Sequence, residues 1–399
     1  MRRHHSIHSL LLVYLFCFLL TQLNHYYALS YLGPQWLASE LYQEQTLNYL
    51  IPVFTVINAS VSILLSSKLR ALNTKSSIQL MLILNSIACL ILPFPYTLLL
   101  YASFILNSLS FAVGLFTLNV VLSSIREQST QASWSVAITM VYSVASVMSV
   151  IIFIALSSFF SYQNYCFIMT GINVSACLCV SLFIPSNKIQ IDKHHISLFQ
   201  YLTIFKHKTF SSVWLGSAVM FTIVLYYIIT FQGFNNLSQS MSISQPVIYI
   251  LLFFSSFGSM ASKIISTIYC KRTKQFHNFY HIPMLLTVLV FGLVSISNNL
   301  HAWFCAYVLI GAIQGLVTPL VYIAAMGLPD TRSQLCARAS VNLLYLFSAG
   351  ILSFWVTCDR VYHLSTTATS LGIFGVSLVL YVLQYRLGIF TKRQIISKS

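Results

Sequence analysis

The sequence predicts an all-α membrane protein with twelve transmembrane helices, arranged as two pseudo-symmetric six-helix bundles. Three observations support this fold class. Hydrophobic residues make up 57% of the chain and charged residues only 7%, whereas roughly 25% of the residues are charged in a soluble domain. The apolar residues gather in stretches of about 20, the length that crosses a bilayer as a helix. An aromatic pattern in the first half of the chain also recurs in the second half.

Short polar loops separate the apolar stretches. The joins near Pro93 and Pro95, and near Ser161, are so tight that their boundaries could move by several residues, and eleven or thirteen spans are the alternatives. The twelve expected spans are residues 8–32, 47–67, 76–94, 96–122, 134–160, 163–184, 209–233, 246–268, 281–298, 301–327, 337–358 and 365–388.

The aromatic repeat indicates that the two halves arose by duplication. Residues 26–33 read Tyr-Tyr-Ala-Leu-Ser-Tyr-Leu-Gly, and residues 226–233 read Tyr-Tyr-Ile-Ile-Thr-Phe-Gln-Gly. Each copy closes the outer end of the first apolar stretch of its half. Weaker matches follow in the same order, after the second and eighth stretches and after the fourth and tenth. Repeats of this kind are typical of secondary transporter folds.

The basic residues predict the orientation in the membrane. With the N-terminus in the cytoplasm, all of the 21 Lys and Arg residues except Arg360 lie on the inner side. This asymmetry follows the positive-inside rule. The net charge of +15 is therefore a topological signal, and it does not predict nucleic-acid binding, because the basic residues are spread thinly over short loops. We expect a multi-pass protein of the cytoplasmic (inner) membrane with both termini in the cytoplasm.

The longest polar interruption divides the chain into the expected domains. These are an N-terminal bundle at 1–184, a cytoplasmic linker with an amphipathic segment at 185–208, and a C-terminal bundle at 209–399. The linker contains adjacent histidines, but no carboxylate or thiol completes a set of metal ligands. Cys177 and Cys179 likewise lack a second ligand pair. The sequence therefore predicts no cofactor and no metal.

The first apolar stretch has a second interpretation. Arg2 and Arg3, followed by the apolar run 10–20, resemble a secretory signal, and residues 28–30 resemble a cleavage site. Removal of residues 1–30 would destroy the first copy of the repeat and leave an odd number of helices. A retained first helix is therefore the favoured interpretation.

Together these features resemble the major facilitator superfamily of secondary transporters. The family's best-known motif follows the second helix and holds a small residue, an acid, a base and a glycine. Here residues 63–70 read Ile-Leu-Leu-Ser-Ser-Lys-Leu-Arg, which is similar to the version in lactose-permease-like and phenylpropionate-permease-like members. Ser67 stands in the place of the acid and Arg70 in the place of the glycine. The second copy, at 258–263, has Ser262 in the place of the acid.

The resemblance implies a cytoplasmic gate. In the family, the loop motif holds the cytoplasmic helix ends together through charge pairing in the outward-open state. With serine in both acidic positions, Lys68 and Lys263 must pair elsewhere. The alternative is that these basic residues only set the topology, because exposed ion pairs contribute little stability. The candidate gate residues are Ser67, Lys68, Arg70, Glu127, Ser262, Lys263, Asp330 and Arg332.

Charged side chains are expected only outside the membrane core. All six carboxylates lie in loops or at the ends of apolar stretches, and we expect no Lys or Arg at mid-membrane. A charge at the centre of a membrane helix costs about 2.5–3.5 kcal/mol, so such residues usually mark an ion or substrate path. Their absence argues against a buried carboxylate relay, and it favours a neutral, zwitterionic or amphipathic solute.

Polar residues at membrane depth supply the candidate binding site. In the family, the first, fourth, seventh and tenth helices line the central cavity. His25 is the one histidine well inside an apolar stretch, and it could carry a coupling proton. The alternatives are hydrogen bonds between helices and, for the tyrosines, a belt at the membrane surface. The candidate substrate-binding residues are Gln22, His25, Tyr26, Asn107, Tyr142, Tyr226, Gln314 and Asn342.

The resemblance implies a secondary active transporter that works by alternating access. Its expected partners are a small-molecule solute, a coupling proton or other ion, and the lipid bilayer, with no nucleic acid, and we expect a monomer. A membrane enzyme is disfavoured, because the polar residues of the outer side form no known catalytic motif. A transport-inactive member that acts as a sensor or assembly factor is the alternative, because the loop motif has lost its acids.

The basic asymmetry generates a topological prediction. Cysteine labelling or reporter fusions should place Gln239 outside, and should place inside Lys75, Lys193, Lys274 and Ser399. Finding Lys193 and Gln239 on the same side of the membrane would contradict the division into six plus six helices.

Overall fold

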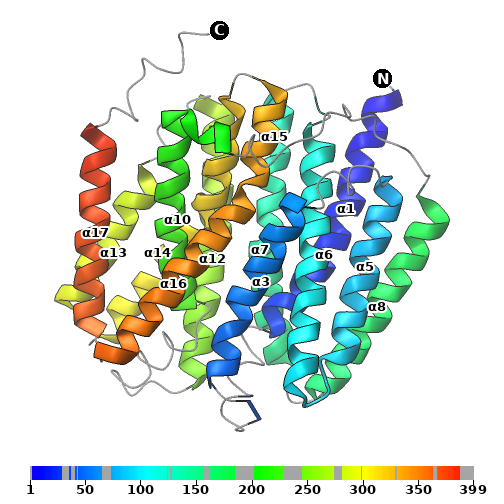
Figure 1. The fold of residues 1–399 in the computed structure, drawn as a ribbon, viewed down its shortest axis with the longest axis horizontal. Coiled ribbons are helices and arrows are strands. Elements are labelled where there is room, and N and C mark those ends of the chain that lie inside the picture. Colours follow the sequence, from blue (N-terminus) through cyan, green and yellow to red (C-terminus); the bar gives the residue numbers. More distant parts are fainter. Residues whose placement is uncertain are drawn as a thin grey trace. The chain divides into compact units, whose positions relative to one another are not determined.

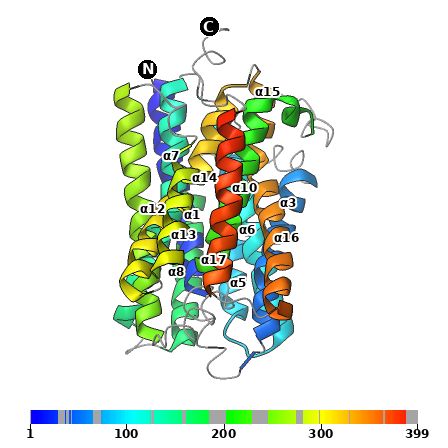
Figure 2. The same ribbon diagram turned by 90° about the vertical axis from the view of Figure 1, so that its left-hand side faces the viewer.

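The computed structural model confirms the all-α fold, with no β-strand among the residues that it describes. Twelve long helices lie in the described part of the chain, one for each expected span (Figures 1 and 2). The described residues are 2–28, 36, 41–42, 44–64, 73–123, 125, 128–156, 161–184, 202–228, 245–273, 281–297, 299–328, 330–362 and 366–386.

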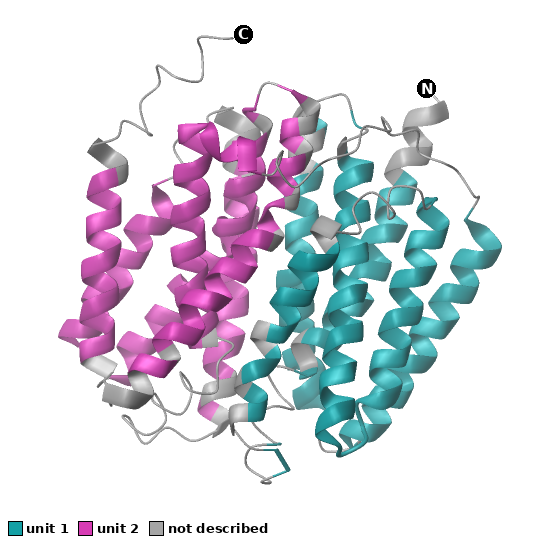
Figure 3. Ribbon diagram, viewed as in Figure 1, with its two compact units in different colours: residues 1–198 teal, residues 199–399 magenta. Residues whose placement is uncertain are grey.

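The chain divides into two compact units, residues 1–198 (unit 1) and residues 199–399 (unit 2) (Figure 3). The helices of unit 1 are α1 (Arg2–Tyr27), α3 (Glu44–Leu64), α5 (Thr74–Ile91), α6 (Thr97–Ser123), α7 (Gln128–Leu156) and α8 (Tyr162–Phe183). Those of unit 2 are α10 (Lys208–Ile228), α12 (Gln245–Thr273), α13 (Ile282–Ile296), α14 (Leu300–Met326), α15 (Thr331–Ala339), α16 (Val341–Tyr362) and α17 (Thr366–Arg386), with a short 3-10 helix, η2 (Ile204–Lys206).

The proposed linker at 185–208 lies only partly within the described residues. Its described part begins at Leu202 and contains η2, whose Ile204 is buried while Leu202 is exposed. The ring of Phe205 packs against Trp214 of α10 with centroids 5.0 Å apart. The exact domain limits and the amphipathic segment stay predictions.

Seven helices contain apolar segments long enough to cross a membrane, judged by length and composition over the described residues. Shorter apolar segments lie in α1, α12, α13 and α17. The long segments are Thr74–Ile91, Thr97–Leu122, Trp134–Ala155, Tyr162–Phe183, Lys208–Tyr227, Leu300–Ala325 and Cys336–Trp355.

Polar side chains cap the first turns of several helices. Asn73 begins α5 by accepting a hydrogen bond from the Ser76 backbone N–H at 2.7 Å. Ser161 caps α8 and Asn299 caps α14 in the same way. Such caps satisfy backbone N–H groups that the first turn of a helix leaves without partners. Between α5 and α6, the turn at 92–96 holds both prolines, which cannot continue a helix.

The same helix pairs pack together in both units, which supports the duplication inferred from the sequence. In unit 1, α1 packs on α7, α3 on α6, and α5 on both α6 and α8. In unit 2, the corresponding pairs are α10 with α16, α12 with α14, and α13 with both α14 and α17. The two units thus share the same order of helices and the same pairs of packed helices.

The eleventh expected span differs from the structure at its start. The sequence predicts one helix from 337, whereas α15 begins at Thr331 and a turn at Ser340 separates it from α16. The carbonyl oxygen of Ser340 accepts a hydrogen bond from the indole N–H of Trp214 at 3.1 Å. A polar turn inside an apolar stretch gave no sequence signal, because its partner lies on another helix.

Helices α12 and α14 approach each other so closely that their backbones are in contact. A Cβ atom added at Gly311 would lie 1.8 Å from the backbone oxygen of Ser255, and one added at Gly258 would lie 2.1 Å from the backbone oxygen of Val308. A Cβ added at Gly315 would lie 2.4 Å from the Ser259 oxygen. Small residues spaced four apart are a known means of close packing between membrane helices.

This contact predicts that Gly311→Ala destabilises the protein. The added methyl group meets backbone atoms that cannot rotate away, and overpacking of this kind typically costs about 1–3 kcal/mol. Thermal unfolding of the purified protein in detergent measures the loss. Gly350→Ala is the matched control, since nothing lies within 4 Å of its added Cβ and alanine favours a helix by about 1 kcal/mol over glycine. Equal unfolding temperatures for the two variants would contradict the packing described here.

Candidate functional site

Five aromatic side chains from four helices form a connected cluster in unit 1. We call Phe18, His25, Phe54, Phe111 and Tyr142 the unit 1 aromatic cluster. The imidazole of His25 stacks on Phe54, with ring centroids 4.1 Å apart and planes at 24°. Phe54 contacts Phe111 at 5.5 Å, and Phe111 contacts Tyr142 at 5.9 Å. Phe18 lies 5.8 Å from both of these last two rings.

This cluster brings together two candidate residues that lie far apart in the sequence, His25 of α1 and Tyr142 of α7. The rings that connect them, Phe18, Phe54 and Phe111, were not among the sequence candidates. Phenylalanine is common throughout this chain, with 29 copies, so its presence in an apolar stretch carries no signal. The pairing of α1 with α7 and of α3 with α6 is the feature that gathers these rings.

Buried amides lie beside the cluster. Gln22 is one helical turn from His25 and is 1% exposed. Its Nε2 donates to the Thr21 hydroxyl at 3.4 Å, while its Oε1 has no hydrogen-bond partner in the described chain. Asn58 lies one turn after Phe54 and is fully buried, and neither polar atom of its amide has a protein partner among the described residues.

Asn107 is held in the same region. It is buried in α6 next to Ser108, whose hydroxyl donates to the Phe54 backbone oxygen at 2.6 Å. A buried polar atom without a hydrogen bond typically costs about 1–3 kcal/mol. The amides of Gln22 and Asn58 therefore offer hydrogen-bonding capacity that the described protein itself does not use.

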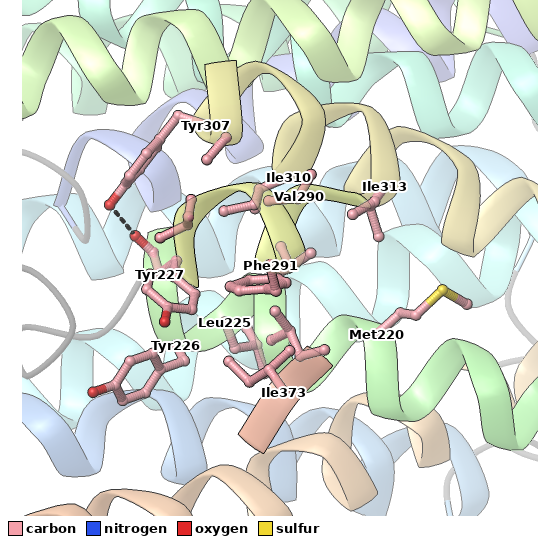
Figure 4. Packing of buried hydrophobic residues seen from close by; sticks show 14 of the residues in the cluster. Met220, Leu225, Tyr226, Tyr227, Val290, Phe291, Tyr307, Ile310, Ile313 and Ile373 are labelled. Carbon is pink, nitrogen blue, oxygen red and sulfur yellow. Dashed lines mark hydrogen bonds between the residues drawn. The ribbon is translucent and has the colours of Figure 1, made fainter. Parts of the chain in front are cut away.

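In unit 2, the second copy of the tyrosine pair is buried within a different aromatic group. Tyr226 stacks on Trp355 with centroids 4.8 Å apart and planes at 8°. Tyr227 packs against Trp303 at 5.5 Å, and its backbone oxygen accepts a hydrogen bond from the Tyr307 hydroxyl at 2.8 Å (Figure 4). Both tyrosines are 2% exposed. This burial disfavours a belt at the membrane surface for the second copy of the pair.

The remaining binding candidates are less constrained. Gln314 is half-buried in α14, between the two glycines that contact α12. The side chains of Tyr26 and Asn342 lie outside the described residues. The binding role of each candidate stays a prediction.

The gate candidates fall into two groups. Ser262 donates its hydroxyl to the Ser259 backbone oxygen at 3.0 Å. Asp330 caps α15, and its two carboxylate oxygens accept hydrogen bonds from the backbone N–H and the hydroxyl of Ser333, at 2.8 and 2.6 Å. The second group lies outside the described residues, and it consists of the side chain of Arg332 and residues Ser67, Lys68, Arg70 and Glu127.

Two basic side chains are buried in unit 2, contrary to the expectation from the sequence. Lys263 was expected near the cytoplasmic end of the eighth span, which was predicted to end at 268, but α12 continues to Thr273, and Lys263 is only 3% exposed. The helix outlasts its apolar part, so hydropathy alone placed its end too early. Arg338, expected at the cytoplasmic edge, is 1% exposed in α15. No three His, Cys, Asp or Glu side chains in the described ranges come close enough to hold a metal ion.

Comparison with known proteins gives a consistent result. A model of the Major Facilitator Superfamily matches residues 14–354. Among curated proteins, none matches the sequence. The human organic anion transporter MFSD10 (TETRAN) is similar in structure, with a TM-score of 0.74 at 12% identity over 96% of this chain and 99% of that one.

Two further solved structures share the fold. A POT family transporter in complex with a thioalcohol-conjugated peptide has a TM-score of 0.74 at 13% identity, covering 96% of each chain. The nucleoside transporter NupG has a TM-score of 0.66 at 12% identity, covering 96% of this chain and 100% of that one. At these identities the similarity shows the fold, and it does not distinguish the lactose-permease-like branch.

The unused amide of Asn58 generates a prediction about whether this amide contributes to the stability of the fold. Asn58→Leu replaces a buried amide that lacks a protein partner with an apolar group of similar shape, so the unfolding temperature should not fall. Asn73→Leu is the control, because it removes a helix cap worth typically about 1 kcal/mol. Thermal unfolding of both variants in detergent tests this. A greater loss of stability in Asn58→Leu than in Asn73→Leu would mean that the amide is structural.

Proposed function

Because the chain belongs to the major facilitator superfamily, we propose that it is a secondary active transporter that moves a small neutral, zwitterionic or amphipathic solute across the cytoplasmic membrane by alternating access. The family assignment makes it a multi-pass membrane protein of a transporter family. The chemical class of solute is our inference from the side chains described above.

One observation supports the solute class most strongly, the unused amide capacity beside the unit 1 aromatic cluster. Aromatic rings offer apolar surface to a solute, and amides offer both a donor and an acceptor without a charge. In this proposal Gln22 and Asn58 bind polar groups of the solute, with Asn107 as a further candidate. Phe54 and Phe111 bind its apolar part. Tyr226 and Gln314 are the corresponding candidates of unit 2.

Alternating access requires contacts that form in one state and break in another. We assign this role to the proposed cytoplasmic gate, of which Ser262, Lys263 and Asp330 are described. Because Lys263 is buried, a gate built on it has a stricter requirement for a partner than a gate built on an exposed lysine. A buried amine needs a partner in every state, since an uncompensated charge away from water is strongly unfavourable.

A transport-inactive member of the family is the second candidate function. It is favoured by the loss of both acids from the loop motif, where Ser67 and Ser262 stand instead. The hydroxyl of Ser262 binds its own helix, so it does not replace the charge pairing of the family motif. Such a protein would bind its ligand as a sensor without moving it.

A thermal-shift screen followed by counterflow decides between these two functions. Purified protein is screened against a metabolite library, since a bound ligand raises the unfolding temperature. Each hit is then tested for exchange across proteoliposomes that contain the protein. We expect neutral or zwitterionic hits that exchange. Hits that bind and do not exchange would favour the sensor.

The position of His25 generates a prediction about coupling. An imidazole is the side chain whose ordinary titration range includes neutral pH, and it stands here within the candidate site. If a proton drives transport, His25→Gln should retain solute exchange and lose accumulation driven by a proton gradient. The exposed His301→Gln is the control and should accumulate solute like the wild type. Normal accumulation by His25→Gln would remove His25 from the mechanism.

A further inference from the structure

Arg338 is a charged side chain buried in unit 2, with no hydrogen-bond partner among the residues that the structure describes. It lies in the last turn of α15 and is 1% exposed. None of its three guanidinium nitrogens, Nε, Nη1 and Nη2, has a hydrogen-bond partner in the described chain. A guanidinium keeps its charge in proteins and carries five N–H donors. Burial of such a group without an anion is strongly unfavourable, so this arrangement needs an explanation.

The acids that the structure describes in unit 2 do not supply the missing charge. Asp330 is the nearest in sequence, but it begins α15, about 12 Å along the helix axis from Arg338, and both of its carboxylate oxygens are bound by Ser333. Asp359 lies in the last turn of α16, about 27 Å along that helix from its first residue. The partner of Arg338 must therefore come from elsewhere.

The position of Arg338 is fixed by the fold. Tyr322 of α14 is near enough to interact with the guanidinium electrostatically. Helix α15 packs against η2, which carries the exposed Lys206 and so adds positive charge to this side of the unit. The hydrogen bond from Trp214 to the Ser340 oxygen holds the turn just after Arg338. The position of Arg338 therefore does not depend on an ion pair.

We propose that Arg338 binds an oxyanion, the phosphate or carboxylate group of a ligand, inside unit 2. The planar fork of a guanidinium matches two oxygens of such a group, and these charge-assisted pairs are the strong ones. The anion comes either from the headgroup of an anionic lipid or from a free anion in the aqueous phase. This site concerns unit 2 alone, so it stands or falls separately from the proposed transport of a solute.

Thermal unfolding of the full chain in nanodiscs tests the proposal and identifies the source of the anion. In the first arm, sodium phosphate is titrated against sodium chloride at matched ionic strength, in discs of phosphatidylcholine. In the second arm, phosphatidylglycerol replaces part of the phosphatidylcholine. We expect the unfolding temperature of the wild type to rise by about 2 °C when the ligand concentration is ten times its dissociation constant. A rise with phosphate indicates a free anion, and a rise only with phosphatidylglycerol indicates a lipid headgroup.

Variants show whether Arg338 is responsible. Arg338→Gln should abolish the rise. It should also unfold at a temperature no lower than that of the wild type in phosphatidylcholine without phosphate, because an uncompensated buried charge has been removed. Lys206→Gln is the control, since it removes an exposed charge near α15 and should keep the rise. Arg338→Lys keeps the charge without the fork and should need about tenfold more anion for the same rise.

The proposal is overturned by either of two results. One is a wild type that shows no rise in either arm, which would mean that another group of the chain already pairs with Arg338. The other is a full rise in Arg338→Gln, which would place the anion elsewhere. If Arg338→Gln fails to fold, the titration of Arg338→Lys decides, because an unchanged anion requirement would also overturn the assignment.

Discussion

A bilayer offers no water to satisfy the backbone, and this constraint determines most of the structure. Each spanning segment must bond its own N–H and C=O groups, which only a helix achieves within one segment. The hydroxyls obey the same requirement. Ser103 and Ser110 of α6 donate to backbone oxygens of α5, at 2.8 Å each, and so connect two helices without exposing a polar group. Serine and threonine thus hold together bundles whose apolar faces gain little by leaving lipid.

The fold was predictable from the sequence because helix length, apolar content and basic loops all act locally. The end of α12 was not, since the helix continues past the apolar residues that hydropathy detects. The burial of Arg338 was hidden for a related reason. A basic residue near the end of an apolar stretch is read as a loop residue, whereas α15 carries this one into the protein. Both errors arise where a helix extends beyond the apolar residues by which hydropathy detects it.

The candidate site was predictable only in its polar members. Gln22, His25 and Asn107 stand out as polar residues in apolar stretches, and the structure places them on α1 and α6, two helices that pack together in unit 1. The rings of Phe18, Phe54 and Phe111 were invisible, because their importance comes from the pairing of helices and not from their residue type. Asn58 was overlooked, although a buried amide in α3 is the same kind of signal as Gln22.

The contact between α12 and α14 has a mechanical consequence. Where the backbones are in contact at Gly258 and Gly311, neither helix can slide or rotate without a steric clash. The two helices should therefore move together as a rigid pair. The contact between α10 and α16 is of another kind, made by hydroxyls such as Ser348, which donates to the Ala218 oxygen at 2.8 Å. A hydroxyl can exchange one backbone oxygen for another as its acceptor with little change in free energy. Any internal deformation of unit 2 should therefore occur mainly between α10 and α16, while α12 and α14 keep their positions relative to each other.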